Sequence, residues 1–300
     1  MQANFTRDAV YHAERLPTFV DHNPQWHFEA NAENLSLANA WWLCNLSHLA
    51  YYDEVDVVPI LKRVGLTFEA FIDDRKEQDS HGKLIKDTQA LIASNEEAIM
   101  LVFRGTEPDA IKDILADAKL PLVDFPGKGK VHSGFYQALS GDCWQHILDV
   151  LQLRENRNKA LWISGHSLGA ALAMIAAAHL EPAGIYNFGS PRVGDSVFCS
   201  NFDTMNFHRF ANCSDLVTQV PLKDLFDYQH AGTLQYFDAS GQLHTEPNQN
   251  FIDNDQFKAR WLYPFQALPI PFLNSKLLFR TLADHAIVNY AYNIWKNLTH

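Results

Sequence analysis

The chain has 300 residues and a formal net charge of −11, from 24 Lys and Arg against 35 Asp and Glu. Hydrophobic residues make up 47% of it, which excludes a disordered chain and supports a sizeable buried core. The acidic balance and the lack of a basic cluster argue against nucleic-acid binding and against electrostatic docking on an anionic bilayer.

The N-terminus and the cysteines suggest neither membrane insertion nor metal binding. Residues 1–8 contain no basic start followed by an apolar core, so we expect no signal peptide. No apolar stretch is long enough to span a bilayer, so we expect no transmembrane segment, and the cellular location stays open. The scattered cysteines match no metal spacing and are expected to be buried thiols: Cys44, Cys143, Cys199 and Cys213.

Hydrophobic periodicity predicts an α/β architecture. The elements predicted in chain order are a helix over 34–52, strands over 66–72, 88–93 and 98–104, a helix over 110–118, a helix over 135–153, a strand ending at 164, a helix after 167, a strand over 184–188, a helix around 196–205, strands over 207–211 and 233–238, and a helix over 282–298. Their alternation predicts a mostly parallel sheet with helices on both faces and antiparallel strands at its N-terminal end. The turn at 94–97 predicts that the strands over 88–93 and 98–104 form a hairpin. We interpret 1–300 as one domain with an N-terminal helical extension over 1–65.

A G-x-S-x-G pentapeptide, residues 165–169, separates the strand ending at 164 from the Ala-rich helix that follows. This context predicts a nucleophile elbow, a tight turn that holds the hydroxyl of Ser167 clear of the chain. The flanking positions must lack bulk, which explains Gly165 and Gly169.

A serine nucleophile needs a base within hydrogen-bond reach and a carboxylate that orients the base. Asp215 opens the loop after the strand over 207–211 and is the preferred acid, followed by Asp195 and Asp224. His285, at the start of the last helix, suits the base, but position alone leaves two competitors open. These are His230 and His244.

Several ordered motifs resemble the class 3 lipase family, which is typified by fungal triacylglycerol lipases. The matching segments are 102–106 (VFRGT), 131–135 (VHSGF), 163–169 (ISGHSLG), 188–194 (FGSPRVG), 209–221 with Asp215, 230–232 (HAG) and 284–285 (DH). The resemblance implies an α/β-hydrolase fold and a catalytic triad of Ser167, Asp215 and His285. It assigns His230 a structural role.

Developing charge on the tetrahedral oxygen requires prepositioned donors. One is the backbone N–H of Leu168, directly after the nucleophile. The resemblance places the second at Thr106 and lets Asp117 hold the Thr106 side chain. An ordinary solvated acid is an equally good interpretation of Asp117.

Two further segments are open to two interpretations each. Residues 107–120 form a candidate lid, because Ile111, Ile114 and Leu115 share one face where the family carries a lid; the alternative is an ordinary surface helix. The apolar segment 261–273 contains three prolines, which we expect to exclude a helix, and it either packs as core or lines an acyl-chain site.

Together these features predict a serine esterase or lipase that hydrolyses lipid esters such as acylglycerols at a lipid–water interface, with no cofactor and no metal. A feruloyl or short-chain esterase, or a phospholipase A1, would use the same triad. A non-catalytic lipid-binding protein on a hydrolase scaffold is the alternative from another class.

Overall fold

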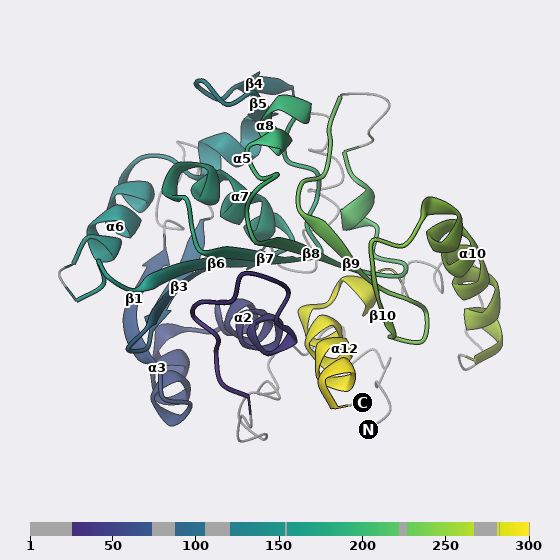
Figure 1. Cartoon of the computed structure of the whole chain (residues 1–300), viewed down its shortest axis with the longest axis horizontal. Helices are drawn as coiled ribbons and strands as arrows, with labels where there is room; N and C mark the ends of the chain where they lie inside the picture. Colours follow the sequence, from purple (N-terminus) through teal and green to yellow (C-terminus); the bar gives the residue numbers. More distant parts are fainter. Residues whose placement is uncertain are drawn as a thin grey trace, which may run out of the picture.

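The computed structural model describes residues 26–73, 88–105, 121–153, 155–221, 227–266, 281 and 283–299. Within these ranges eight strands form one sheet in the order β1-β2-β3-β6-β7-β8-β9-β10 (Figure 1). The strands from β3 to β9 pair in parallel, whereas β1, β2 and β10 join in antiparallel fashion. This confirms the predicted sheet. The strands are β1 Thr67–Asp73, β2 Gln89–Ser94, β3 Ala98–Phe103, β6 Ala160–His166, β7 Gly184–Phe188, β8 Phe207–Asn212, β9 Thr233–Phe237 and β10 Leu243–Thr245.

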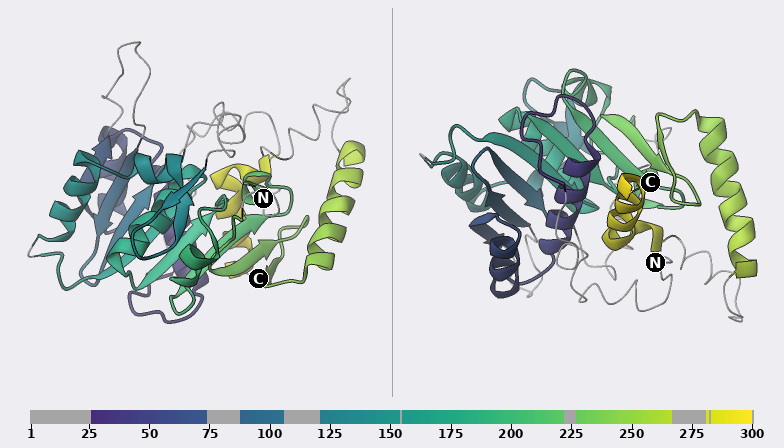
Figure 2. Two further views of the ribbon diagram at one scale, coloured as in Figure 1. Left: turned by 90° about the horizontal axis from the view of Figure 1, so that it is seen from above. Right: turned by 60° about the horizontal axis from the view of Figure 1, so that its bottom comes forward.

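Helices cover both faces of this sheet, as predicted (Figures 1 and 2). On one face lie α5, α6, α7 and α8, and on the other lie α2, α3 and α12, while α10 lies beside β10 at the edge. The helices are α2 Leu37–Leu49, α3 Glu54–Arg63, α5 Ser133–Ala138, α6 Asp142–Leu151, α7 Leu168–Leu180, α8 Ser196–Ser200, α10 Gln249–Gln266 and α12 Ile287–Thr299.

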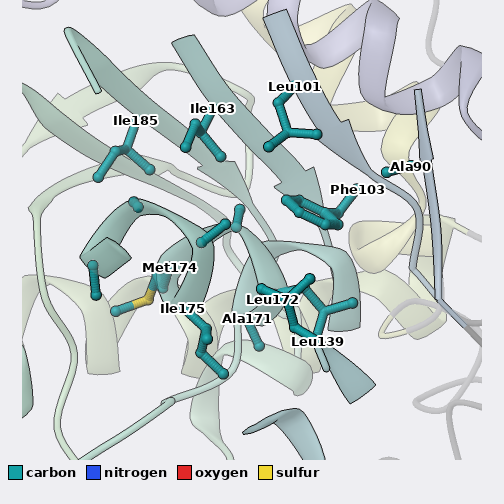
Figure 3. Packing of buried hydrophobic residues seen from close by; sticks show 14 of the residues in the cluster. Ala90, Leu101, Phe103, Leu139, Ile163, Ala171, Leu172, Met174, Ile175 and Ile185 are labelled. Carbon is teal, nitrogen blue, oxygen red and sulfur yellow. The ribbon is translucent and has the colours of Figure 1, made fainter. Parts of the chain in front are cut away.

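The helix α7 is packed tightly against the middle of the sheet. Its residues 169–178 are all buried, and six of these ten residues are alanines, which let the helix backbone approach the strands closely. Figure 3 shows Met174 and Ile175 of α7 in one cluster with Ile163 and Ile185 of the sheet. Each such aliphatic side chain contributes roughly 1.5–3 kcal/mol when fully buried. The turn that precedes α7 is therefore anchored on both sides.

The helix α2, from the predicted N-terminal extension, covers the middle of the opposite face. It contacts β3, β6, β7 and α12. Every residue of α2 after Leu37 is buried, and Trp41 and Leu43 are fully so. Residues 37–49 thus belong to a hydrophobic cluster on this face of the sheet, opposite the cluster that contains α7. That 1–300 forms a single domain stays a prediction.

Three predicted helices differ in the structure. The helix predicted over 135–153 is divided into α5 and α6 by Gly141, whose φ of 74° favours glycine. The helix predicted around 196–205 ends at Ser200. The last helix begins at Ile287, after a bend at Ala286, so His285 lies in a helical turn before it.

The expectation that prolines exclude a helix from 261–273 is wrong for 261–266. The helix α10 continues to Gln266, two residues past Pro264. A proline removes one backbone donor and disfavours a helix interior, but it does not forbid a helix from continuing past it. Residues 267–273 lie outside the described ranges.

Several short elements of the structure were not predicted from the sequence. The loop rich in Pro and Gly contains a small hairpin, β4 Leu122–Asp124 paired with β5 Lys130–His132. The helix α3 and the edge strand β10 were not predicted either.

Candidate active site

Ser167 occupies the turn between β6 and α7, at the position where the G-x-S-x-G spacing predicts an elbow. Its φ of 58° and ψ of −126° lie outside the backbone regions that residues other than glycine ordinarily adopt. Strain of this kind costs of order 1–3 kcal/mol and persists only where the surroundings enforce it. A Cβ at Gly165 would collide with the backbone of Gly169, and one at Gly169 would collide with the backbone of Phe103. Both glycines are therefore required by close approach of the chain.

His285 joins Ser167 to Asp215 through hydrogen bonds. Its Nε2 lies 2.9 Å from Ser167 Oγ, and its Nδ1 lies 2.9 Å from both carboxylate oxygens of Asp215. All three side chains are buried. Ser167 follows β6, Asp215 follows β8 and His285 precedes α12, so the parallel sheet brings together residues from distant parts of the sequence. A carboxylate accepts, so His285 Nδ1 carries the proton and Nε2 faces the serine hydroxyl as acceptor.

The environment of Asp215 favours its ionised form. Burial alone would raise the pKa of this carboxyl, but the charge and hydrogen bond of His285 and the hydroxyl of Tyr290 together hold the pKa below its usual value of 3.8. Tyr290 Oη donates to Asp215 Oδ2 at 2.6 Å, and the backbone N–H of Val217 donates to Oδ1 at 2.9 Å. Asp215 is thus a fixed anion beside His285.

Gly189, in the turn after β7, leaves room for the contact between Asp215 and His285. Its φ is 61°, and a Cβ there would lie 2.8 Å from Asp215 Oδ2 and 3.1 Å from His285 Nδ1. A side chain at this position would displace the acid from the base.

The competing histidines have other partners. His230 Nε2 lies 2.8 Å from the carbonyl oxygen of Thr218, and burial beside Arg209 and Arg192 holds its pKa well below 6.5. His244 Nε2 lies 2.9 Å from Asp238 Oδ2. These contacts are consistent with the structural role expected for His230 and give His244 a partner other than Ser167.

The alternative acid Asp195 also has other partners. Its carboxylate accepts from the backbone N–H of Phe198 at 2.8 Å and of Lys130 at 3.1 Å, and so caps α8. The other alternative, Asp224, lies outside the described residues.

Of the predicted oxyanion donors, Leu168 can be placed. It is the first residue of α7, where the N–H has no partner within the helix and where the helix dipole favours negative charge. Thr106, Asp117 and the candidate lid over 107–120 lie outside the described residues.

Three residues near the site were not predicted. Tyr290 holds Asp215, while Tyr51 and His166 form hydrogen bonds that reach His285. His166 lies inside the recognised pentapeptide, so its position was available from the sequence. No local pattern marks the two tyrosines, since their partners are 75 and 115 residues away.

The described part of the chain also bears on metal binding, on the state of the cysteines and on membrane insertion. No group of three or more His, Cys, Asp or Glu side chains is placed there to hold a metal ion. The four cysteines are free and buried, as expected. Among the helices of the described ranges, none has the length and apolarity needed to cross a membrane.

Known proteins resemble this chain in sequence. The family model described as Lipase (class 3) matches residues 100–225. The lipase of Rhizomucor miehei is 28% identical over 211 residues, which cover 62% of this chain and 57% of that protein. These matches confirm that the chain resembles the class 3 lipase family. It spans about half the length of the curated relatives that it matches.

Solved structures match the chain at the level of the fold. A triacylglycerol lipase whose catalytic centre is formed by a serine protease triad matches with a TM-score of 0.59 at 24% identity, covering 72% of this chain and 89% of its own. A mutant form of MDLA from Penicillium cyclopium matches with a TM-score of 0.63 at 21% identity, covering 87% and 100%. The α/β-hydrolase fold predicted from the motifs is confirmed.

Proposed function

We propose that this protein, which resembles the class 3 lipases, is a serine ester hydrolase that acts on lipid esters, with acylglycerols as its substrate class. The observation that carries the proposal is the hydrogen-bonded series Ser167–His285–Asp215, with both links at 2.9 Å. This is the arrangement in which an otherwise weak serine nucleophile gains a base and the base gains an orienting carboxylate.

In the proposed reaction, Ser167 Oγ attacks the ester carbonyl carbon while His285 Nε2 takes the hydroxyl proton. The tetrahedral intermediate collapses, the C–O bond to the alcohol breaks, and His285 returns the proton to the leaving oxygen. A water molecule then attacks the acyl-enzyme with His285 again as base, which releases the carboxylic acid and restores Ser167. Asp215 stays ionised throughout and stabilises the imidazolium form of His285.

The negative oxygen of the tetrahedral intermediate requires donors that are already in place. We propose the backbone N–H of Leu168 as one donor, because it is the first N–H of α7 and directly follows Ser167. Thr106 is proposed as the second donor, with Asp117 supporting it, on the resemblance alone. Ser167 is fully buried, so a substrate reaches its hydroxyl only if the residues around the site leave an opening.

Initial rates on p-nitrophenyl esters from acetate to palmitate test this function, with Ser167→Ala as the matched control. We expect wild-type rates that favour longer acyl chains and hydrolysis of an emulsified triacylglycerol. A preference for acetate or feruloyl esters would replace the lipase by an esterase, and a preference for phosphatidylcholine vesicles would indicate a phospholipase A1. No hydrolysis of any ester would instead favour a non-catalytic lipid-binding protein.

A further inference from the structure

His166, directly before the proposed nucleophile, uses both ring nitrogens. Its Nε2 lies 2.7 Å from the backbone carbonyl oxygen of His285, and its Nδ1 lies 2.8 Å from the hydroxyl of Tyr51. Its ring also packs against the His285 ring, with centroids 4.7 Å apart. His166 therefore supports the backbone and the imidazole of the proposed base together.

The partners of His166 determine its protonation state. A carbonyl oxygen only accepts, so Nε2 must carry the hydrogen. In a neutral imidazole Nδ1 is then an acceptor, and the Tyr51 hydroxyl donates to it. Burial, and the proximity of His285, lower the pKa of His166 from 6.5 to about 3. His166 is thus a neutral donor toward His285.

Tyr51 is itself held from two sides. The guanidinium of Arg104 lies over its ring at 5.2 Å from the centroid, within the range of a cation–π contact. The backbone N–H of Gly105 donates to its hydroxyl. A Cβ at Gly105 would collide with this hydroxyl, so the strand end approaches Tyr51 as closely as a glycine permits.

We propose that Tyr51 and His166 form a positioning bridge, which holds the backbone of His285 so that its imidazole meets Ser167 at hydrogen-bonding distance. The bridge runs from the end of β3, through Tyr51 after α2 and His166 in the elbow, to the turn before α12. The inference rests on the proposed function of Ser167 and His285. It assigns a role in the site to Tyr51, which lies in the predicted N-terminal extension.

The bridge also keeps positive charge away from the proposed base. The groups that face His166 are Tyr51, His285, Asp215, His48 on α2 and Tyr290 on α12. A protonated His166 beside His285 would oppose the imidazolium that forms during the reaction. A neutral His166 gives the same mechanical support without that repulsion.

Four variants test the bridge on a soluble ester such as p-nitrophenyl butyrate. Tyr51→Phe keeps the ring and removes the donor to Nδ1, and we expect kcat to fall about 3- to 10-fold with KM unchanged. His166→Leu removes both bonds, and we expect a loss of about 100-fold, as for a misplaced catalytic group. His166→Gln retains an N–H that reaches the His285 carbonyl and should rescue most of that loss.

Tyr186→Phe is the matched control. The Tyr186 hydroxyl is buried in the same hydrophobic cluster but accepts from the backbone N–H of Ser36 at 2.8 Å, away from the site. This variant should lose thermal stability and keep kcat within about twofold of wild type, because a net hydrogen bond is lost without any change near His285.

The outcomes separate this inference from the proposed function. A wild type that hydrolyses the ester, with Tyr51→Phe equal to Tyr186→Phe in kcat, would overturn the bridge alone. A wild type with no hydrolysis and no fluorophosphonate label on Ser167 would overturn both. Imidazole ¹⁵N shifts give a readout that is independent of activity: we expect the neutral Nε2–H tautomer of His166 at both pH 7 and pH 5. An imidazolium at pH 5 would also overturn the bridge.

Discussion

The hydroxyl of Tyr290 lies 2.6 Å from Asp215 Oδ2, so the carboxylate that faces His285 is fixed from α12. The same hydroxyl accepts from the backbone N–H of Asn212 at 3.0 Å. Tyr290 therefore links the end of β8 to the acid, and its removal leaves one buried acceptor and one buried donor without this partner.

Tyr290→Phe should lower the free energy of unfolding by about 1.5–3 kcal/mol at pH 7, the range for a hydrogen bond to a charged group. The pKa of Asp215 is depressed in the folded state, so its contribution to stability is present above the unfolded pKa and is lost as pH falls through the folded pKa. Loss of the Tyr290 hydroxyl should raise the pKa of Asp215 in the folded state. This narrows the pH range over which ionised Asp215 contributes to stability. Urea denaturation at pH 7 and pH 3 measures both effects, and an unchanged midpoint at pH 7 would contradict them.

Asp215→Asn should reduce kcat by about 10⁴-fold with the fold intact, since an amide favours the wrong imidazole tautomer of His285. Asp195→Asn is the control, because its amide oxygen still accepts from the N–H of Phe198. Kinetics combined with circular dichroism measure the two variants. Near-normal turnover of Asp215→Asn would indicate that another acid orients the base.

His285→Ala should abolish turnover, whereas His230→Ala should mainly lower stability, because His230 is bonded to the Thr218 carbonyl rather than to Ser167. We expect a lower melting temperature for the His230 variant, with kcat within about tenfold of wild type. A folded but inactive His230 variant would show that the base has been assigned incorrectly.

Acid should destabilise the fold through its buried neutral histidines. The pKa of His166 is lowered to about 3, and that of His208 to about 4, in both cases chiefly by burial. Below pH 6.5 these histidines bind protons in the unfolded chain but stay neutral in the folded state. The free energy of unfolding therefore falls as pH drops. Each histidine contributes a slope of about 1.4 kcal/mol per pH unit between its two pKa values.

Urea denaturation between pH 6 and pH 4.5 measures that slope. His208→Gln should reduce the slope by the contribution of one histidine, about 1.4 kcal/mol per pH unit, since glutamine does not titrate. A slope that is the same in the variant and in wild type would contradict the assignment of His208 as a buried neutral group.

The central sheet and the elbow were predictable because their signals are local. Buried parallel strands appear as apolar runs, and the tight turn at Ser167 requires glycine on both sides. The order of the motifs then indicated Asp215 and His285. Nothing in a short window indicates which distant side chains face each other, and so Tyr290 and Tyr51 were missed.

The errors in the elements have similar causes. Gly141 is one residue within an otherwise helical pattern, and its positive φ divides the helix without changing the periodicity around it. Pro264 suggested a helix break, yet α10 continues past it to Gln266. Short strands such as β10, with three residues, exist through pairing with a neighbour and carry almost no periodic signal.

The central claim is that Ser167, activated by His285, is the nucleophile for ester hydrolysis. The most direct test is the initial rate of ester hydrolysis by Ser167→Ala and wild type, with mass spectrometry of both after treatment with a fluorophosphonate. We predict one adduct on the peptide that carries Ser167 in wild type, none in the variant, and a loss of about 10⁴–10⁶-fold in kcat, because serine and histidine act as a unit. A variant that keeps activity within tenfold of wild type, or an adduct on another residue, would contradict the account.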